Sequence, residues 1–197
     1  DLVPVDGDDE RSSGCQRFVT ATLDALVEYR PSLVVLASSE TYIESDRWAL
    51  EAPDSGDRFT SASAKAAVWQ DGLTRTISKL QAYGIEVVIV HPIPKAYGWD
   101  PRQCAVARIL LAPGTCGTSW QLADANKTRA RQMSAESAAA AATNIRTLDV
   151  ARLLCPDGTC STRQGGTWTY RDGGHISVAA AAWLTPEFER LLAPSSR

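Results

Sequence analysis

The 197-residue sequence predicts an α/β fold built on a parallel sheet. Two short runs, 33–37 and 85–90, are almost wholly apolar and rich in β-branched residues. Runs of this kind are typical of strands that are buried on both faces of a parallel sheet. Each run follows a segment with apolar residues at helical spacing, and the turns fall at Pro31 and Gly84. Helix, short turn and strand, repeated along the chain, indicate an α/β sheet with right-handed crossovers.

The other elements follow from the same patterns in order along the chain. We expect helices over residues 16–29, 64–83, 120–142 and 176–192, and strands over residues 33–37, 85–90 and 144–150. The third helix is rich in alanine, a strong helix former, and Pro186 interrupts the fourth. Polar or Gly- and Pro-rich segments predict irregular loops over residues 1–14, 44–63, 97–117 and 155–171. Because no repeat or linker composition occurs, we expect one domain over residues 1–197.

Composition excludes some classes of function. The net charge is −3 and the isoelectric point is near 5.4. A nucleic-acid partner would call for clustered Lys and Arg, and no such cluster occurs. No apolar run reaches the roughly 18 residues that span a bilayer. Apolar residues make up 44% of the chain, which is ordinary globular usage.

The five cysteines predict disulfides and an oxidising compartment. Cys104 and Cys116 bracket one loop, and Cys155 and Cys160 bracket a Pro-Asp-Gly-Thr turn. A metal site is the rival interpretation, but CxxC spacing is absent and both histidines lie far away in sequence. We therefore expect two disulfides and no metal. Cys15 is left over, so it is either a free thiol or the partner of a cysteine upstream of Asp1.

The segment Asp172-Gly173-Gly174-His175 carries the clearest chemistry in the sequence. A carboxylate three residues before an imidazole, on a turn, can fold back onto the ring. It would then fix the tautomer of His175 and leave the other ring nitrogen as a general base. The alternative is an ordinary helix start at which Asp172 or Ser177 serves as the N-cap.

Two other groups of residues remain open to more than one interpretation. His91 ends an apolar strand, where we favour a hydrogen-bonded structural histidine over a cleft residue. Four tryptophans fall in loop-like regions, where they either stack on sugar rings or cover the core, and we favour the second. They are Trp48, Trp99, Trp120 and Trp168.

The chain resembles the SGNH domain that is fused to acyltransferase-3 membrane proteins, a group of cell-envelope O-acetyltransferases. The matching features, in order, are Cys15, the segments 30–37 and 69–84, the predicted strand 87–90 with Pro92 and Pro94, the paired cysteines, and the C-terminal motif 172–177. The resemblance implies a three-layer α/β/α, flavodoxin-like SGNH-hydrolase fold with a mainly parallel sheet. It also implies that Asp172 and His175 are catalytic.

One block of the family pattern is not visible. Members open with a strand that ends in Gly-Asp-Ser, whose serine is the nucleophile, whereas the nearest string here is Gly7-Asp8-Asp9. We therefore expect that the sequence starts inside the domain, that the nucleophile lies upstream, and that Cys15 pairs there. By position at a strand end, Ser38, Ser39 and Glu40 are expected to line the pocket.

The expected function is extracytoplasmic O-acetyl or O-acyl transfer to a cell-envelope saccharide through a Ser-His-Asp mechanism. The resemblance implies an acyl donor and a saccharide acceptor, a fused or partner acyltransferase-3 membrane domain that tethers the chain, and no cofactor. Two alternatives stay open. One is a secreted SGNH carbohydrate esterase or deacetylase, and the other is a non-catalytic saccharide-binding domain that has lost its nucleophile.

Overall fold

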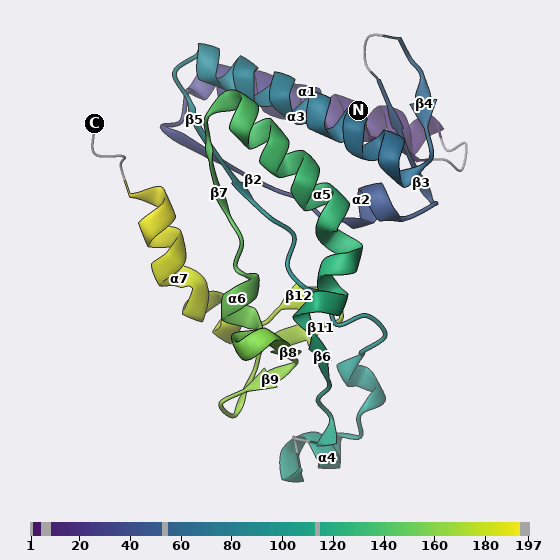
Figure 1. The fold of residues 1–197 in the computed structure, drawn as a ribbon, viewed down its shortest axis with the longest axis vertical. Coiled ribbons are helices and arrows are strands. Elements are labelled where there is room, and N and C mark those ends of the chain that lie inside the picture. Colours follow the sequence, from purple (N-terminus) through teal and green to yellow (C-terminus); the bar gives the residue numbers. More distant parts are fainter. Residues whose placement is uncertain (1, 5–8, 53–54, 113–114, 194–197) are drawn as a thin grey trace. The chain divides into compact units, whose positions relative to one another are not determined.

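The computed structural model describes residues 2–4, 9–52, 55–112 and 115–193. Its chain divides into two compact units (Figure 1). Unit 1 consists of Asp1–Pro92 and Thr128–Leu148, and unit 2 of Ile93–Lys127 and Asp149–Arg197. The expectation of a single domain stays a prediction. Gly7 and Asp8, from the string nearest to the family's nucleophile block, lie outside the described residues.

Unit 1 is built on a three-stranded parallel sheet in the order β2-β5-β7. Strand β2 (Leu33–Ala37) pairs with β5 (Glu86–Val90), so that Val34 lies opposite Val87. Strand β7 (Arg146–Leu148) pairs with the other edge of β5. The predicted α/β class and its parallel sheet are therefore confirmed, although the third strand is shorter than residues 144–150.

Helices α1 (Asp9–Tyr29), α3 (Ala62–Ala82) and α5 (Leu122–Thr143) are the long helices that accompany this sheet. Helix α3 connects β2 to β5, and α5 connects β5 to β7. The strand order β2-β5-β7 advances in one direction across the sheet. Right-handed crossovers therefore place both helices on the same face of the sheet. The core on that face includes Val34, Val87 and Ile89 of the sheet, Ile77 and Leu80 of α3, and Ala139 and Ala140 of α5. On the opposite face, Val35 is 43% exposed.

The turns from helix to strand in unit 1 share one backbone feature. The residues Arg30, Gly84 and Asn144 each adopt a left-handed conformation, with φ of 47°, 77° and 53°. A left-handed residue just after a helix stops it and turns the chain, and glycine does so without a Cβ penalty. Gly84 therefore ends α3 as the sequence predicts.

Two segments expected to be loops contain regular structure instead. Strands β1 (Leu2–Pro4), β3 (Trp48–Glu51) and β4 (Arg58–Phe59) form an antiparallel sheet, and α2 covers Thr41–Glu44. Helix α1 begins at Asp9, seven positions before the predicted start at Gln16.

Unit 2 is made of two-stranded antiparallel pairs and helices. Strand β6 (Ser119–Gln121) pairs with β8 (Thr159–Ser161), β9 (Arg163–Gln164) with β10 (Thr167–Trp168), and β11 (Tyr170–Asp172) with β12 (His175–Ile176). The helical pieces are η1 (Pro101–Gln103), α4 (Val106–Leu111), α6 (Ala151–Leu154), η3 (Pro156–Gly158) and α7 (Val178–Leu192). The segment 155–171 thus contains the β9–β10 hairpin and strands that pair outside it, and Trp120 belongs to a strand that precedes α5.

The last helix differs from its prediction at two points. It starts at Val178 because the hydroxyl of Ser177 accepts a hydrogen bond from Ala180 N at 3.0 Å and caps it. It also continues through Pro186, which removes one backbone donor without ending the helix.

Both predicted disulfides are present in unit 2. Cys104 is bonded to Cys116 and Cys155 to Cys160, while Cys15 is a free, exposed cysteine in α1. Among the helices of the described residues, none is long and apolar enough to cross a membrane.

Candidate active site

The predicted Asp172 and His175 lie on the two strands of the β11–β12 hairpin. They face each other across the ladder, and Gly173 and Gly174 form the turn between them. Gly173 is needed because a neighbouring segment passes very close to it: a Cβ there would lie 2.9 Å from Ala96 O and 3.0 Å from Trp99 O. Ala96 N also donates to Gly173 O at 2.9 Å. The glycine thus lets the backbone of the 96–99 segment hold the turn.

The imidazole and the carboxylate form a direct hydrogen bond. His175 Nδ1 lies 2.7 Å from Asp172 Oδ1, and the backbone N–H of Gly174 donates to the same oxygen at 2.9 Å. An ionised carboxylate only accepts hydrogen bonds, so Nδ1 carries the proton in this pair. The ring is 68% exposed. Nε2 of His175 is therefore left as the basic nitrogen of the pair.

Asp172 is held in its ionised form. Its pKa is lowered from 3.8 to about 2, first by the hydrogen bond from Gly174 N and then by the one from His175. The guanidinium of Arg171 adds a weaker contact at 3.4 Å to Oδ2. A carboxylate that stays charged over the physiological range can orient His175 and stabilise its protonated form.

Hydrogen bonds at both ends of the hairpin hold the strands that carry the pair. The hydroxyl of Tyr170, at the start of β11, donates to Pro94 O at 2.5 Å, and this side chain is fully buried. After β12, the hydroxyl of Ser177 donates to Trp168 O at 2.5 Å while its backbone N–H donates to Thr169 O at 2.9 Å. Ser177 therefore caps α7 and joins its start to Trp168. The sequence alternative in which Ser177 is the N-cap is thus confirmed. Asp172 does not serve as the cap and contacts His175 instead.

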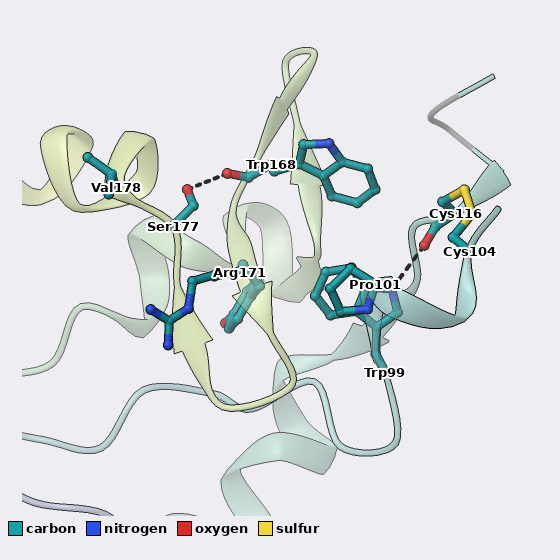
Figure 2. A pocket seen from close by; sticks show the side chains of 9 residues that line it. Trp99, Pro101, Cys104, Cys116, Trp168, Arg171, Ser177 and Val178 are labelled. Atoms are coloured by element: carbon teal, nitrogen blue, oxygen red, sulfur yellow. Dashed lines mark hydrogen bonds between the residues drawn. A yellow bond between two sulfur atoms is a disulfide. The ribbon is translucent and has the colours of Figure 1, made fainter. Parts of the chain in front are cut away.

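A pocket of about 340 Å³ lies in unit 2 beside the same hairpin (Figure 2). Its lining consists of Trp99, Pro101, Cys104, Cys116, Trp168, Tyr170, Arg171, Ser177 and Val178. The rings of Trp99 and Trp168 stack with centroids 5.8 Å apart, and Trp99 Nε1 donates to Cys116 O at 2.9 Å. Two of the tryptophans predicted to cover the core therefore form a pocket wall.

Ser38, Ser39 and Glu40 lie in unit 1, directly after β2. The hydroxyl of Ser38 donates to Glu136 Oε1 at 3.0 Å, and Ser39 Oγ donates to Thr41 Oγ1 at 2.9 Å. Glu40 is buried. None of the three lines the pocket in unit 2, and their role in binding substrate stays a prediction.

Ser38 belongs to a buried polar network that the sequence analysis did not identify. His91 Nδ1 lies 2.7 Å from Glu136 Oε2, and Gln132 Nε2 donates to Ser38 Oγ at 2.6 Å. The signal was present as Gln132 and Glu136, four residues apart in an alanine-rich helix, because that spacing puts both on one helix face. His91 is thus a hydrogen-bonded buried residue, as favoured from the sequence.

Among the described residues, no group of three or more His, Cys, Asp or Glu side chains gathers in a way that could hold a metal ion. The acidic and imidazole groups that do meet form pairs, Asp172 with His175 and Glu136 with His91.

Comparison with known families gives the identity that this geometry suggests. The family model described as "SGNH domain (fused to AT3 domains)", where AT3 is acyltransferase-3, matches residues 2–190. Searches of curated proteins and of solved structures gave no match. The resemblance carried by Asp172, His175 and the preceding strands is therefore confirmed over nearly the whole sequence. The chain belongs to the family of SGNH domains that are fused to AT3 domains, a hydrolase and acyl-transfer type of domain.

Proposed function

We propose that this domain transfers an acyl group to a saccharide hydroxyl, with His175 as the general base and Asp172 as the residue that orients it. The observation that carries the proposal is the 2.7 Å contact between His175 Nδ1 and Asp172 Oδ1 across the β11–β12 hairpin. It leaves Nε2 on an exposed ring, free to take a proton from a reacting hydroxyl. The nucleophile is a serine of the family's Gly-Asp-Ser block, and no residue of this sequence is assigned to it.

In the first step, Nε2 of His175 takes the proton of the serine hydroxyl while the serine oxygen attacks the carbonyl carbon of the acyl donor. The bond from the acyl carbon to the donor's leaving group breaks. The leaving group then takes the proton from the imidazolium. The ionised Asp172 stabilises the imidazolium while it exists, which its low pKa permits at neutral pH.

In the second step, the acyl-serine ester is cleaved by the acceptor. Nε2 of His175 takes the proton of a saccharide hydroxyl, the hydroxyl oxygen attacks the ester, and the serine oxygen leaves with the proton that His175 returns. Water in place of the saccharide would give hydrolysis by the same route. The same pair of side chains therefore serves both transfer and esterase chemistry.

The setting proposed for this reaction is the outer side of the cytoplasmic membrane. Two disulfides support it because such bonds persist in oxidising compartments. The AT3 fusion named in the family description supports a membrane-bound partner that supplies the acyl group. The acceptor in this proposal is a saccharide of the cell envelope.

The test is acyl transfer by the full-length protein in membranes or detergent, with the saccharide product and the free acyl acid quantified separately by mass spectrometry. His175→Ala should lower product formation on the order of 10³-fold or more, and Asp172→Asn should lower it by a comparable factor. Asp157→Asn is the matched control, because Asp157 lies on an exposed turn with a φ of 54° that asparagine also adopts.

The result separates the candidate functions. Saccharide ester as the main product supports transfer, and free acid as the only product would support an esterase. Equal product formation by the wild type and His175→Ala would contradict the proposal and leave a non-catalytic binding domain.

A further inference from the structure

The pocket beside the β11–β12 hairpin has almost no polar group available to a ligand. The indole N–H of Trp99 donates to Cys116 O, the hydroxyl of Tyr170 to Pro94 O, and the hydroxyl of Ser177 to Trp168 O. The rest of the wall is hydrocarbon, aromatic ring or disulfide, apart from the guanidinium of Arg171. A saccharide buried here would leave its hydroxyls without hydrogen-bond partners, which costs free energy. The lining therefore favours an apolar ligand group over a sugar ring.

The size of the pocket also suits a ligand. Its volume of about 340 Å³ lies at the lower end of the usual range for small-molecule sites, roughly 300–1,000 Å³. The walls are held by covalent and aromatic contacts, since the Cys104–Cys116 disulfide lies beside the stacked Trp99 and Trp168 (Figure 2). A preformed cavity of this kind binds a hydrocarbon group without first paying to order its own side chains.

The pocket and the proposed catalytic pair share one hairpin. Tyr170 and Arg171 line the pocket directly before Asp172, and Ser177 and Val178 line it directly after His175 and Ile176. Successive residues of a strand are only about 3.3 Å apart. A group bound in the pocket therefore contacts residues that are next to Asp172 and near His175 in the sequence.

We propose that this pocket binds the hydrocarbon chain of the acyl group and selects acyl chains longer than acetyl. This inference rests on the proposed function, because it names the acyl group that the reaction would transfer. Each additional CH₂ that enters the pocket should tighten binding about fourfold, which corresponds to roughly 0.8 kcal/mol. Arg171, which lines the pocket, directly precedes Asp172 in the sequence.

The direct test is binding without reaction. The N-methylamides of acetic, butanoic and hexanoic acid are stable analogues of an acyl group, and ligand-observed NMR titration against the full-length protein gives their dissociation constants. We expect the dissociation constant to fall about fourfold for each CH₂ from the two-carbon to the six-carbon amide. Equal dissociation constants across the series would overturn the proposal. Displacement of N-methylhexanamide by an equal concentration of N-acetylglucosamine would also overturn it.

Two matched pairs of variants locate the binding site. Trp168→Ala removes a wall of the pocket and should abolish the chain-length dependence, whereas Trp183→Ala removes a 43%-exposed tryptophan of α7 that does not line it. Val178→Asp places a charge at the pocket and should weaken hexanamide binding at least tenfold. Its control, Ala179→Asp, adds the same charge one position later, on an exposed residue outside the lining. The second pair keeps the test valid if Trp168→Ala fails to fold, and unchanged binding by Val178→Asp would overturn the proposal.

Failure of this inference can be told apart from failure of the proposed function. His175→Ala should abolish acyl transfer and leave the chain-length dependence of amide binding intact. Transfer that depends on His175 but shows the same chain preference in Val178→Asp would refute the pocket and keep the function. Chain-length-dependent binding in a protein that transfers no acyl group would refute the function and keep the pocket.

Discussion

At the scale of single residues, ionisation of the Asp172 carboxyl group contributes to the stability of the folded protein. Its folded pKa of about 2 lies below its ordinary 3.8. A carboxyl whose pKa is depressed by folding contributes stability above its unfolded pKa, and that contribution is lost as the pH falls through the folded pKa. For Asp172 the window therefore lies between about pH 4 and pH 2.

We expect the wild type to lose more stability than Asp172→Asn as the pH is lowered through this window, because asparagine does not titrate. Urea unfolding midpoints at pH 6, 4, 3 and 2 measure the difference, with Asp157→Asn as the control. Parallel curves for the wild type and Asp172→Asn would show that the hydrogen bonds from Gly174 and His175 do not hold the carboxylate ionised.

The turn of the hairpin gives a second prediction at this scale. Gly173→Ala would put a Cβ 2.9 Å from Ala96 O, so the backbone of one segment must shift, and overpacking of this kind costs about 1–3 kcal/mol. Gly174→Ala is the matched control, since the nearest atom to its Cβ is Asp172 Oδ1 at 3.9 Å. Chemical denaturation of both variants checks the difference, and equal losses would contradict the close approach at Gly173.

The sequence predicts part of the site at this scale. Three-residue spacing and two glycines are enough to suggest that Asp172 meets His175, because both partners lie on one local turn. The close approach to Gly173 and the contact between Ser38 and Glu136 depend on segments far apart in the chain, and no local pattern records them. The sequence gives only a weak indication of such contacts. In the case of Ser38, it is the presence of the polar residues Gln132 and Glu136 in an alanine-rich helix.

At the scale of elements, one buried lysine joins helix α3 to the α2–β3 segment. Lys65 is 1% exposed, and its ammonium group donates to Ser45 O at 2.8 Å and Trp48 O at 3.1 Å. Burial lowers the pKa of this lysine, and the charges of Asp46 and Glu44 partly oppose that effect. Ser45 O also accepts a hydrogen bond from Trp48 N at 3.3 Å, so the ammonium group adds a second donor at this turn and joins it to α3.

Lys65→Ala should therefore cost about 2–4 kcal/mol of unfolding free energy, because it leaves a cavity and removes the ammonium donor from the carbonyls of Ser45 and Trp48. Lys79→Ala is the control: it removes a lysine from the same helix whose exposed pair with Asp24 contributes little. Equilibrium denaturation measures both. A cost for Lys65→Ala no larger than that for Lys79→Ala would contradict the role of the buried ammonium.

The long elements follow from the sequence and the short ones do not. Strands β2 and β5 form where continuous apolar runs predict them, since their burial on the sheet depends on their own residues. Strands β4, β9 and β10 have two residues each, too few for an alternating pattern, and their pairing is set by the turns and partners around them. Polar and turn-rich composition predicts loops over 44–63 and 155–171, which contain these short strands.

At the scale of the whole molecule, the chain passes between the two units at residues 92–93, 127–128 and 148–149. These points fall at a strand end, inside α5 and just after β7. None carries the Gly- or Ser-rich composition of a linker, so the sequence shows no boundary there. The division depends on which distant segments pack together, which composition does not record.

The disulfides act at this scale because they restrict the whole unfolded chain. Their cysteines are separated by 12 and 5 positions. Loop-closure entropy then predicts a loss of about 3 kcal/mol for Cys104→Ser with Cys116→Ser, and about 2 kcal/mol for Cys155→Ser with Cys160→Ser. Denaturant unfolding of the two double variants measures these losses. A larger loss for the shorter loop would show that contacts in the folded state outweigh chain entropy.

In the proposed reaction His175, oriented by Asp172, activates a serine nucleophile. The most direct measurement is the rate at which the full-length protein reacts with a fluorophosphonate, which forms a covalent bond to an activated serine and releases fluoride. Mass spectrometry of the intact protein should show one adduct on the wild type and Asp157→Asn. For His175→Ala, the rate should be lower by a factor on the order of 10²–10⁴. An equal rate for the wild type and His175→Ala, or no adduct on the wild type, would contradict the account.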